Sequence, residues 1–88
     1  MPRYFFHSVN RERSPDDEGV DLPDDRAAHA QAVAYAGEVL KFDPQRVWDS
    51  GQWRVEVTDK EGCLLFTVII LGIGSSDNRL VMTGVAML

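Results

Sequence analysis

The alternation of hydrophobic and polar residues is clearest from residue 53 onward, where it predicts a β-strand. Every second residue between 53 and 58 is apolar, namely Trp53, Val55 and Val57, and the residues between them are polar. A period of two is typical of a strand with one buried and one exposed face. We therefore expect a half-buried strand at this place.

A turn and a second, almost wholly apolar strand follow. Asp59 can accept hydrogen bonds from the turn backbone, and Gly62 suits the left-handed position that closes a four-residue hairpin loop. From residue 63 to residue 71 only Thr67 is polar. Such a strand needs cover on both faces, one by a helix and the other by more of the chain or by a second subunit.

The N-terminal region predicts two further strands. Residues 3–9 contain three adjacent aromatic residues, which indicate a strand that is buried on both faces. Residues 10–18 are polar, contain Pro15 and show no periodicity, so we expect an exposed loop. Residues 20–22 are a short strand candidate, which Pro23 terminates. This strand could pair antiparallel with the first one.

An alanine-rich helix is predicted between these strands and the hairpin. Either Asp24 or Asp25 can cap its first turn, because a carboxylate accepts from unpaired N–H groups there. The helix should run to about Leu40, since residues just before Pro44 avoid helical angles. Its apolar stripe consists of Ala28, Ala32, Ala36 and Val39, flanked by Val33 and Leu40. Residues 45–51 should then lead to the hairpin.

These elements predict an α+β fold of the order strand-strand-helix-strand-strand. We expect one antiparallel sheet with a single helix packed on one face, formed by residues 1–71 as one domain. Residues 72–88 form a C-terminal extension, and its last nine residues, 80–88, are apolar apart from Thr83 and Gly84. This extension should add a strand or dock on a neighbouring subunit, which would create a dimer.

Composition narrows the compartment and the partners. The chain has 88 residues, enough for one small domain, and a net charge of −5, which opposes general binding to phosphate backbones. Cys63 is the only cysteine, so no internal disulfide can form. No apolar run approaches the ~20 residues of a membrane helix. We expect a cytoplasmic protein without membrane contact, for which nucleic acid is a minority interpretation.

Three motifs together resemble a known family. They are MPRYFFH at the start, DEGVDLPD before the alanine-rich helix, and WRVEVTD followed by Gly62. The chain resembles a family of short bacterial proteins known only as a domain of unknown function. The resemblance covers residues 1 to about 70, departs from the usual short ending at Gly72, and implies no activity. In element order alone, the chain is also similar to the small domain of HicB-type antitoxins.

Six carboxylates between residues 16 and 25 are the first candidate for a cation site. They are Asp16, Asp17, Glu18, Asp21, Asp24 and Asp25. If Gly19 were the central glycine of a calcium loop, Ser14 would be the first ligand and Asp25 the last, and neither suits that position. No helix precedes the loop. We therefore predict a solvated loop with a helix cap, and no metal site.

Three residues could take part in acid-base or nucleophilic chemistry. His7 and His29 could act as general bases, since histidine as a residue type titrates near neutral pH, and Cys63 could act as a nucleophile beside a base. Neither histidine has a motif partner, and His7 lies among strand aromatics, which favours a structural role. An enzyme would need these residues and acidic groups to converge in one cleft, so we predict no catalytic residue.

Two other patterns suggest ligands on first inspection. The glycines of Gly72-Ile73-Gly74 resemble a dinucleotide loop, but position 77 is an aspartate and no helix pattern follows. A basic and aromatic surface for single-stranded nucleic acid would consist of Arg3, Arg11, Arg13 and Arg54 with Tyr4, Phe5 and Phe6. The net charge favours core aromatics with scattered arginines. We predict no cofactor.

The function that we favour from the sequence is a non-catalytic protein-interaction module that forms a homodimer and binds a protein partner. The apolar excess of the second hairpin strand and of the C-terminal segment, without a catalytic constellation, motivates this interpretation. The alternative is a nucleic-acid-linked regulator of antitoxin type, which is suggested by size, acidity and element order.

Overall fold

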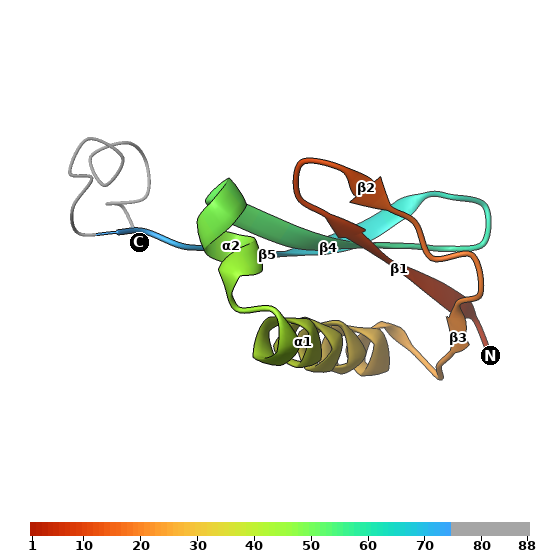
Figure 1. Ribbon diagram of the computed structural model, residues 1–88. Helices are drawn as coiled ribbons and strands as arrows, with labels where there is room; N and C mark the ends of the chain where they lie inside the picture. The colour runs from red at the N-terminus through yellow and green to blue at the C-terminus, as the bar shows by residue number, and fades with distance from the viewer. Residues whose placement is uncertain (75–88) are drawn as a thin grey trace.

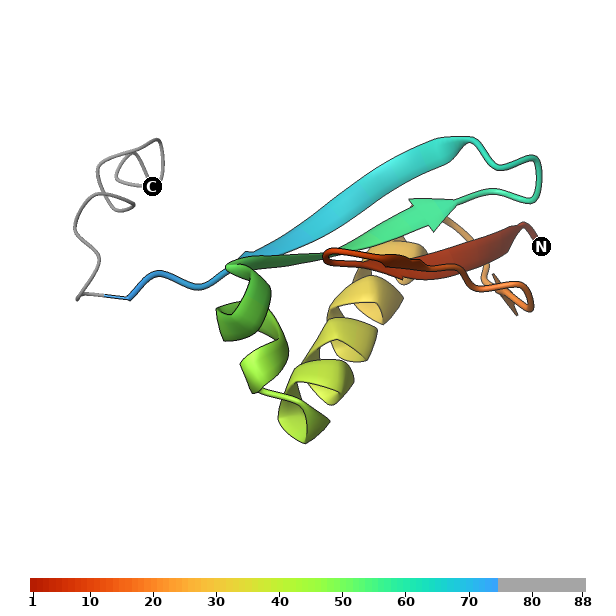
Figure 2. The same ribbon diagram turned by 45° about the horizontal axis from the view of Figure 1, so that its top comes forward.

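The first and the last strands of the domain lie in one antiparallel sheet, and one long helix crosses a face of that sheet (Figures 1 and 2). The structure, a computed structural model, describes residues 1–74. Its helices are α1 (Asp25–Phe42) and α2 (Gln45–Ser50). Its strands are β1 (Arg3–Val9), β2 (Arg13–Ser14), β3 (Val20–Asp21), β4 (Gln52–Thr58) and β5 (Leu64–Leu71).

The sheet has the strand order β2-β1-β4-β5, and β3 also pairs with β1. All pairings are antiparallel, with Ser8 opposite Val55 and Val55 opposite Val68 at the centre. The N-terminal strand is therefore interior, and β5 forms one margin of the sheet. The predicted α+β fold, with one antiparallel sheet and a helix packed on one face, is confirmed.

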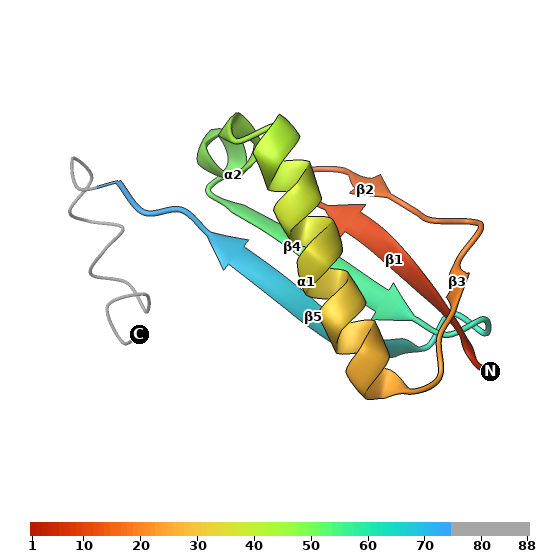
Figure 3. The same cartoon turned by 90° about the horizontal axis from the view of Figure 1, so that it is seen from below.

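Helix α1 covers one face of the sheet, which we call the helix face (Figure 3). Asp24 is the capping residue, because its Oδ1 accepts from the N–H of Ala27 at 2.9 Å. Ala28, Ala32 and Ala36 are buried against the sheet, as their spacing predicts. Small side chains at these positions allow the helix to approach the strands closely. The helix ends at Phe42, two residues beyond the predicted end.

The core lies between α1 and the central strands. Trp53, Val55 and Val57 of β4 are fully buried, and Tyr4 and Phe6 of β1 lie beside them. The indole N–H of Trp53 donates to the hydroxyl of Ser8 at 2.7 Å, so the polar atom of the largest core residue is satisfied. The predicted alternation of β4 is confirmed.

The turn of the hairpin has the predicted chemistry. The Oδ1 atom of Asp59 accepts from the backbone N–H groups of Glu61 and Cys63, both at 2.9 Å. Gly62 has a φ of +86°, a value that favours glycine. The return strand begins at Leu64 and has a β-bulge at Leu65, opposite Val57 and Thr58. Cys63 lies before the strand and is exposed.

Two short elements were not predicted. The expected loop 10–18 contains β2, which pairs with the end of β1, and the segment 45–51 contains α2. Both are too short to show a period in the sequence. Helix α2 ends at Gly51, whose φ is +77°, and its Val47 is buried in the core.

The chain leaves the sheet at Gly72, whose N–H donates to the carbonyl of Gly51 at 3.1 Å. The prediction that residues 80–88 add a strand or contact another subunit lies outside the described residues. No helix within residues 1–74 has the length and hydrophobicity that crossing a membrane requires.

Candidate functional site

The outer edge of β1 is closed along its length by three different groups. Strand β3 pairs with Arg3 and Tyr4 at its start, and β2 pairs with Ser8 and Val9 at its end. Between them, the N–H of Phe6 donates to Oδ2 of Asp16 at 3.1 Å. One carboxylate therefore bridges the gap between two short strands, and this side of the sheet offers little backbone to a partner.

Asp16 also organises the loop that carries it. Its Oδ1 accepts from the backbone N–H groups of Glu18 at 3.0 Å and of Gly19 at 3.2 Å. Burial alone would raise the pKa of this carboxyl. The three backbone hydrogen bonds, together with nearby His7, outweigh burial and lower the pKa below its ordinary value. Asp16 is thus held as a carboxylate that caps backbone groups.

His7 lies buried on the sheet face opposite α1, which we call the open face. Its Nδ1 accepts from the backbone N–H of Asp16 at 3.0 Å, so the neutral ring carries its proton on Nε2. That Nε2 lies 2.9 Å from the hydroxyl of Thr58 and donates to it. Burial and nearby Arg13 lower the pKa of His7, against the opposing charges of Asp16 and Glu56. His7 is therefore a neutral structural residue.

The outer edge of β5 differs from that of β1, because no strand of residues 1–74 pairs with it. Figure 3 shows β5 at the margin of the sheet away from β2 and β3. The strand has eight residues, without a charge or a proline to discourage pairing. Its exposed large side chains are Leu64, Leu65, Ile69 and Leu71. We call this edge, with these four side chains, the β5 surface.

The second hairpin strand was predicted to be covered on both faces. Within the described residues, only its helix face is covered. Phe66, Val68 and Ile70 point to the helix face and pack against the core. The open face of the strand has no such cover, and Leu64 and Ile69 are 59% and 57% exposed. On that face, Asp16 bonds to His7 and Gly19 lies against the ring of Phe5, both on β1. The apolar side chains of β5 are in contact with solvent.

Charged side chains occupy the middle of the open face, beside the β5 surface. Glu56 accepts from Arg54 at 2.9 Å and forms an ion pair with Arg13 at 3.5 Å. Arg54 is opposite Ile69 and Glu56 is opposite Thr67 in the strand register. The exposed apolar area of this face is therefore confined to β5, which points to contact at the edge of the sheet.

An apolar groove of about 240 Å³ lies at the end of β5, between the strand and the two helices. Leu40 of α1, Trp48 of α2 and Ile70 of β5 contribute to its wall. Trp48 is 55% exposed, and a Cβ on Gly72 would lie only 2.9 Å from its ring. The glycine thus lets the chain pass close to the indole, which stays open to solvent on its other side.

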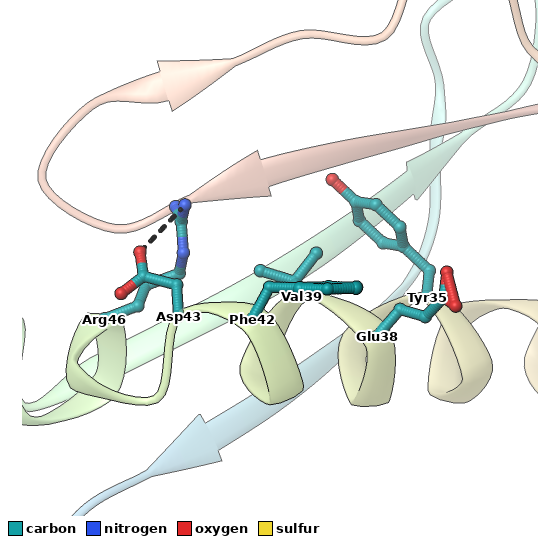
Figure 4. A pocket seen from close by; sticks show the side chains of 6 residues that line it. All are labelled: Tyr35, Glu38, Val39, Phe42, Asp43 and Arg46. Carbon is teal, nitrogen blue, oxygen red and sulfur yellow. Dashed lines mark ion pairs between the residues drawn. The ribbon is translucent and has the colours of Figure 1, made fainter.

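A second groove, of about 320 Å³, lies along the last turns of α1 (Figure 4). It is lined by Tyr35, Glu38, Val39, Phe42, Asp43 and Arg46. The guanidinium of Arg46 pairs with Asp43 at 3.3 Å and lies over the Trp53 ring, 5.8 Å from its centroid. The one cation of this groove is thus already engaged, and its lining includes no nucleophile beside a base.

The structure distributes the acidic cluster among separate tasks. Asp16 caps backbone groups, Asp21 pairs with Arg3 at 2.9 Å, and Asp24 caps α1. Asp25 accepts from the hydroxyl of Tyr4 at 2.7 Å, which, with burial and the nearby acidic charges, raises the pKa of that tyrosine to about 12. Within residues 1–74, no three histidine, cysteine or acidic side chains gather as a metal site would require.

The candidate catalytic residues do not converge. His7 lies on the open face, whereas His29 lies on α1 across the sheet, where its ring meets Phe66 edge-on at 4.5 Å between centroids. Cys63 is exposed in the hairpin turn. The structure therefore places these three side chains on different parts of the molecule.

The candidate basic and aromatic surface, which the sequence did not favour, is also divided. Arg3 donates to Asp21 and to the carbonyl of Glu18, and Arg11 donates to the carbonyl of Asp49 at 3.0 Å. Arg13 and Arg54 share Glu56, while Tyr4 and Phe6 are buried beneath α1. The arginines are thus engaged by protein acceptors and do not alternate with exposed rings.

Sequence reasoning missed two parts of the candidate site. The first is the closure of the β1 edge by Asp16, which depends on a contact across ten residues of loop. The second is Trp48 in the groove, since residues 45–51 were interpreted as a connection. A possible signal for this helix was Pro44, because proline is common at the start of helices.

Comparisons with known proteins define a family but no activity. No curated protein and no solved structure matches the chain. The family model described as a domain of unknown function, DUF6894, matches residues 3–72, which contain every helix and strand given above. The expected resemblance to a family of unknown function is confirmed, and the chain belongs to the DUF6894 family.

Proposed function

We propose that this protein is a non-catalytic interaction module that forms a homodimer through the β5 surface. The observation that carries the proposal is the contrast between the two edges of the sheet. The β1 edge is closed by β2, β3 and Asp16, whereas within residues 1–74 the edge of β5, the longest strand, carries no blocking group. Unpaired strand edges add a further strand readily, and natural proteins usually block them.

A second copy of the chain is the occupant that fits this edge best. Each copy has a net charge of −5, so two copies repel one another where charges meet. Residues 64–71 carry no charge, and contact there keeps the charged groups apart. Antiparallel pairing of two identical strands also obeys two-fold symmetry, since each strand offers the other the same backbone groups.

The exposed area agrees with an interface of this kind. The four side chains of the β5 surface expose on the order of 400 Å², which is within the range of the largest patch on a typical monomer. A standard interface buries about 800 Å² per partner. The strand backbone and further exposed residues would supply the remainder. The pairing joins two sheets into one that carries both α1 helices on the same face.

The non-catalytic part of the proposal is supported by how the chemically competent residues are used. Both ring nitrogens of His7 have hydrogen-bond partners within the fold, and the carboxylate of Asp16 holds three backbone N–H groups. These side chains stabilise the sheet edge and the loop.

The test is the mass of the protein in solution, measured by size-exclusion chromatography with light scattering. We expect twice the 9.9 kDa of the chain for the unmodified protein. Ile69→Lys places a charge on the β5 surface and should give the monomer mass. Phe42→Lys is the matched control, because Phe42 is 81% exposed at the end of α1 and should leave the dimer intact.

A monomer for the unmodified protein at concentrations up to hundreds of micromolar would contradict the proposal. A dimer that survives Ile69→Lys but not Phe42→Lys would also contradict it, because it would place the interface on α1. Circular dichroism of both variants shows whether each one still has its helix and sheet.

A further inference from the structure

We infer that the two β5 strands pair about a two-fold axis at Val68, and that Phe66 of the second copy covers the groove beside Trp48. This inference rests on the proposed dimer and specifies its register and its second contact. It concerns the strand backbone and the groove of about 240 Å³ at the end of β5.

Face matching limits the possible registers. Directly opposed residues of an antiparallel pair point to the same face, so residues of the helix face must oppose residues of the helix face. The two-fold axis must then pass through one residue of the strand. Thr67, Val68 and Ile69 are the central candidates of β5.

The bulge at the start of β5 separates these candidates. It disturbs the ladder where Leu64 opposes Thr58, and the regular pairing extends from Phe66 to Leu71. An axis at Thr67 would place Leu65, from the bulge, opposite Ile69. An axis at Val68 places Phe66 opposite Ile70 and Thr67 opposite Ile69, so that the central pairs are all regular.

A two-fold axis at Ile69 would extend the pairing past the C-terminal end of the strand. It would place Phe66 opposite Gly72, which lies beyond the last strand residue and is bonded to Gly51. A side chain entering there would also meet Trp48, which already lies within 3 Å of the Cβ position of Gly72. With Val68 on the axis, the residues from Phe66 to Ile70 all form regular pairs, and the bulge residue Leu65 is opposite Leu71 only at the end of the pairing.

The same register brings an aromatic ring to the groove. Opposed Cβ atoms lie about 4.5–5.5 Å apart, so Phe66 of the second copy would stand beside Ile70. Ile70 is part of the groove wall, with Leu40 and the half-exposed Trp48. Each groove is completed by the other copy, and the indole of Trp48 loses its contact with water.

Cysteine cross-linking tests the register, in a Cys63→Ser background that removes the native thiol. Two residues on the axis face each other within the Cα range of a disulfide, whereas residues one position away lie beyond it. Under mild oxidation, Val68→Cys should give several-fold more covalent dimer than Thr67→Cys or Ile69→Cys. Dominant cross-linking of either neighbour would overturn the register, and a light-scattering dimer would in that case preserve the proposed function.

The emission of Trp48 gives a second measurement that needs no cysteine. As the protein concentration rises through dimer formation, the emission should move to shorter wavelengths, and Trp48→Phe should remove this shift because Trp53 is fully buried in either state. A dimer by light scattering whose emission does not move would overturn the contact at the groove. A monomer at every concentration would overturn both proposals.

Discussion

Replacing Asp16 with alanine should destabilise the protein more than any other single change in the loop before β3. The carboxylate accepts three backbone hydrogen bonds, two of them from partly buried N–H groups and one from an exposed group. A hydrogen bond to a charged group contributes about 1.5–3 kcal/mol when buried and less when exposed. We expect the free energy of unfolding to fall by about 2–4 kcal/mol, a large share of the 5–15 kcal/mol typical of domains.

The assay is urea unfolding at pH 7, followed by tryptophan fluorescence and circular dichroism, with all variants compared in an Ile69→Lys background that removes dimerisation. Asp17→Ala is the control, because Asp17 is an exposed neighbour of the same charge. It should change stability by less than about 0.5 kcal/mol. Asp16→Asn keeps one oxygen for the turn but presents an amide to the backbone, and should lose about half as much as alanine.

Acid gives an internal check on the same reasoning. Because folding lowers the pKa of Asp16 from its ordinary 3.8, the carboxylate stabilises the fold above that value and loses its contribution as the pH falls through the folded pKa. The gap between the unmodified protein and Asp16→Ala should therefore narrow below pH 4. Equal stability of Asp16→Ala and Asp17→Ala at pH 7 would refute the role of this carboxylate.

Three further predictions concern the core and α1. Folding lowers the pKa of His7, so its neutral ring contributes its full stabilisation above the ordinary pKa of 6.5 and less as the pH falls below that value. The melting temperature should therefore be lower at pH 5.5 than at pH 7.5, and the same melting temperature at both pH values would contradict this. Ser8→Ala leaves the indole N–H of Trp53 buried without its acceptor and should cost about 1–3 kcal/mol in urea unfolding, whereas an unchanged midpoint would show that the bond is dispensable. Gly37→Ala should raise the free energy of unfolding by about 0.5–1 kcal/mol, because a Cβ at this helix position meets no atom within 4 Å. A lower urea midpoint for this variant would mean that the added methyl group clashes with a neighbour.

The larger elements were predictable because their residues are repeated at a fixed period. Trp53, Val55 and Val57 mark the buried face of β4 by alternation, and the alanines of α1 mark the side that meets the sheet. Asp59 and Gly62 specify the hairpin turn by local chemistry. In each case the interactions that determine the element are between residues close together in the sequence, so the pattern of residues predicts the element.

The parts that escaped prediction depend on contacts between distant segments. Strand β2 has two residues and exists because β1 lies beside it. His7 was expected to be structural, but its partners Thr58 and Asp16 could not be inferred from a pattern. The candidate site is the weakest case, because an open strand edge is defined by what lies next to it. The apolar composition of β5 indicated a need for cover without showing which edge was free.

The interior position of β1 has a consequence for how the chain is made. Strand β1 is synthesised well before β4, with which it pairs, and the indole of Trp53 bonds to a hydroxyl that precedes it by 45 residues. The aromatic residues of β1 must therefore wait for β4 while the loop and both helices are synthesised. Folding during translation would pause until the hairpin emerges, and β1 is the segment on which a chaperone would act.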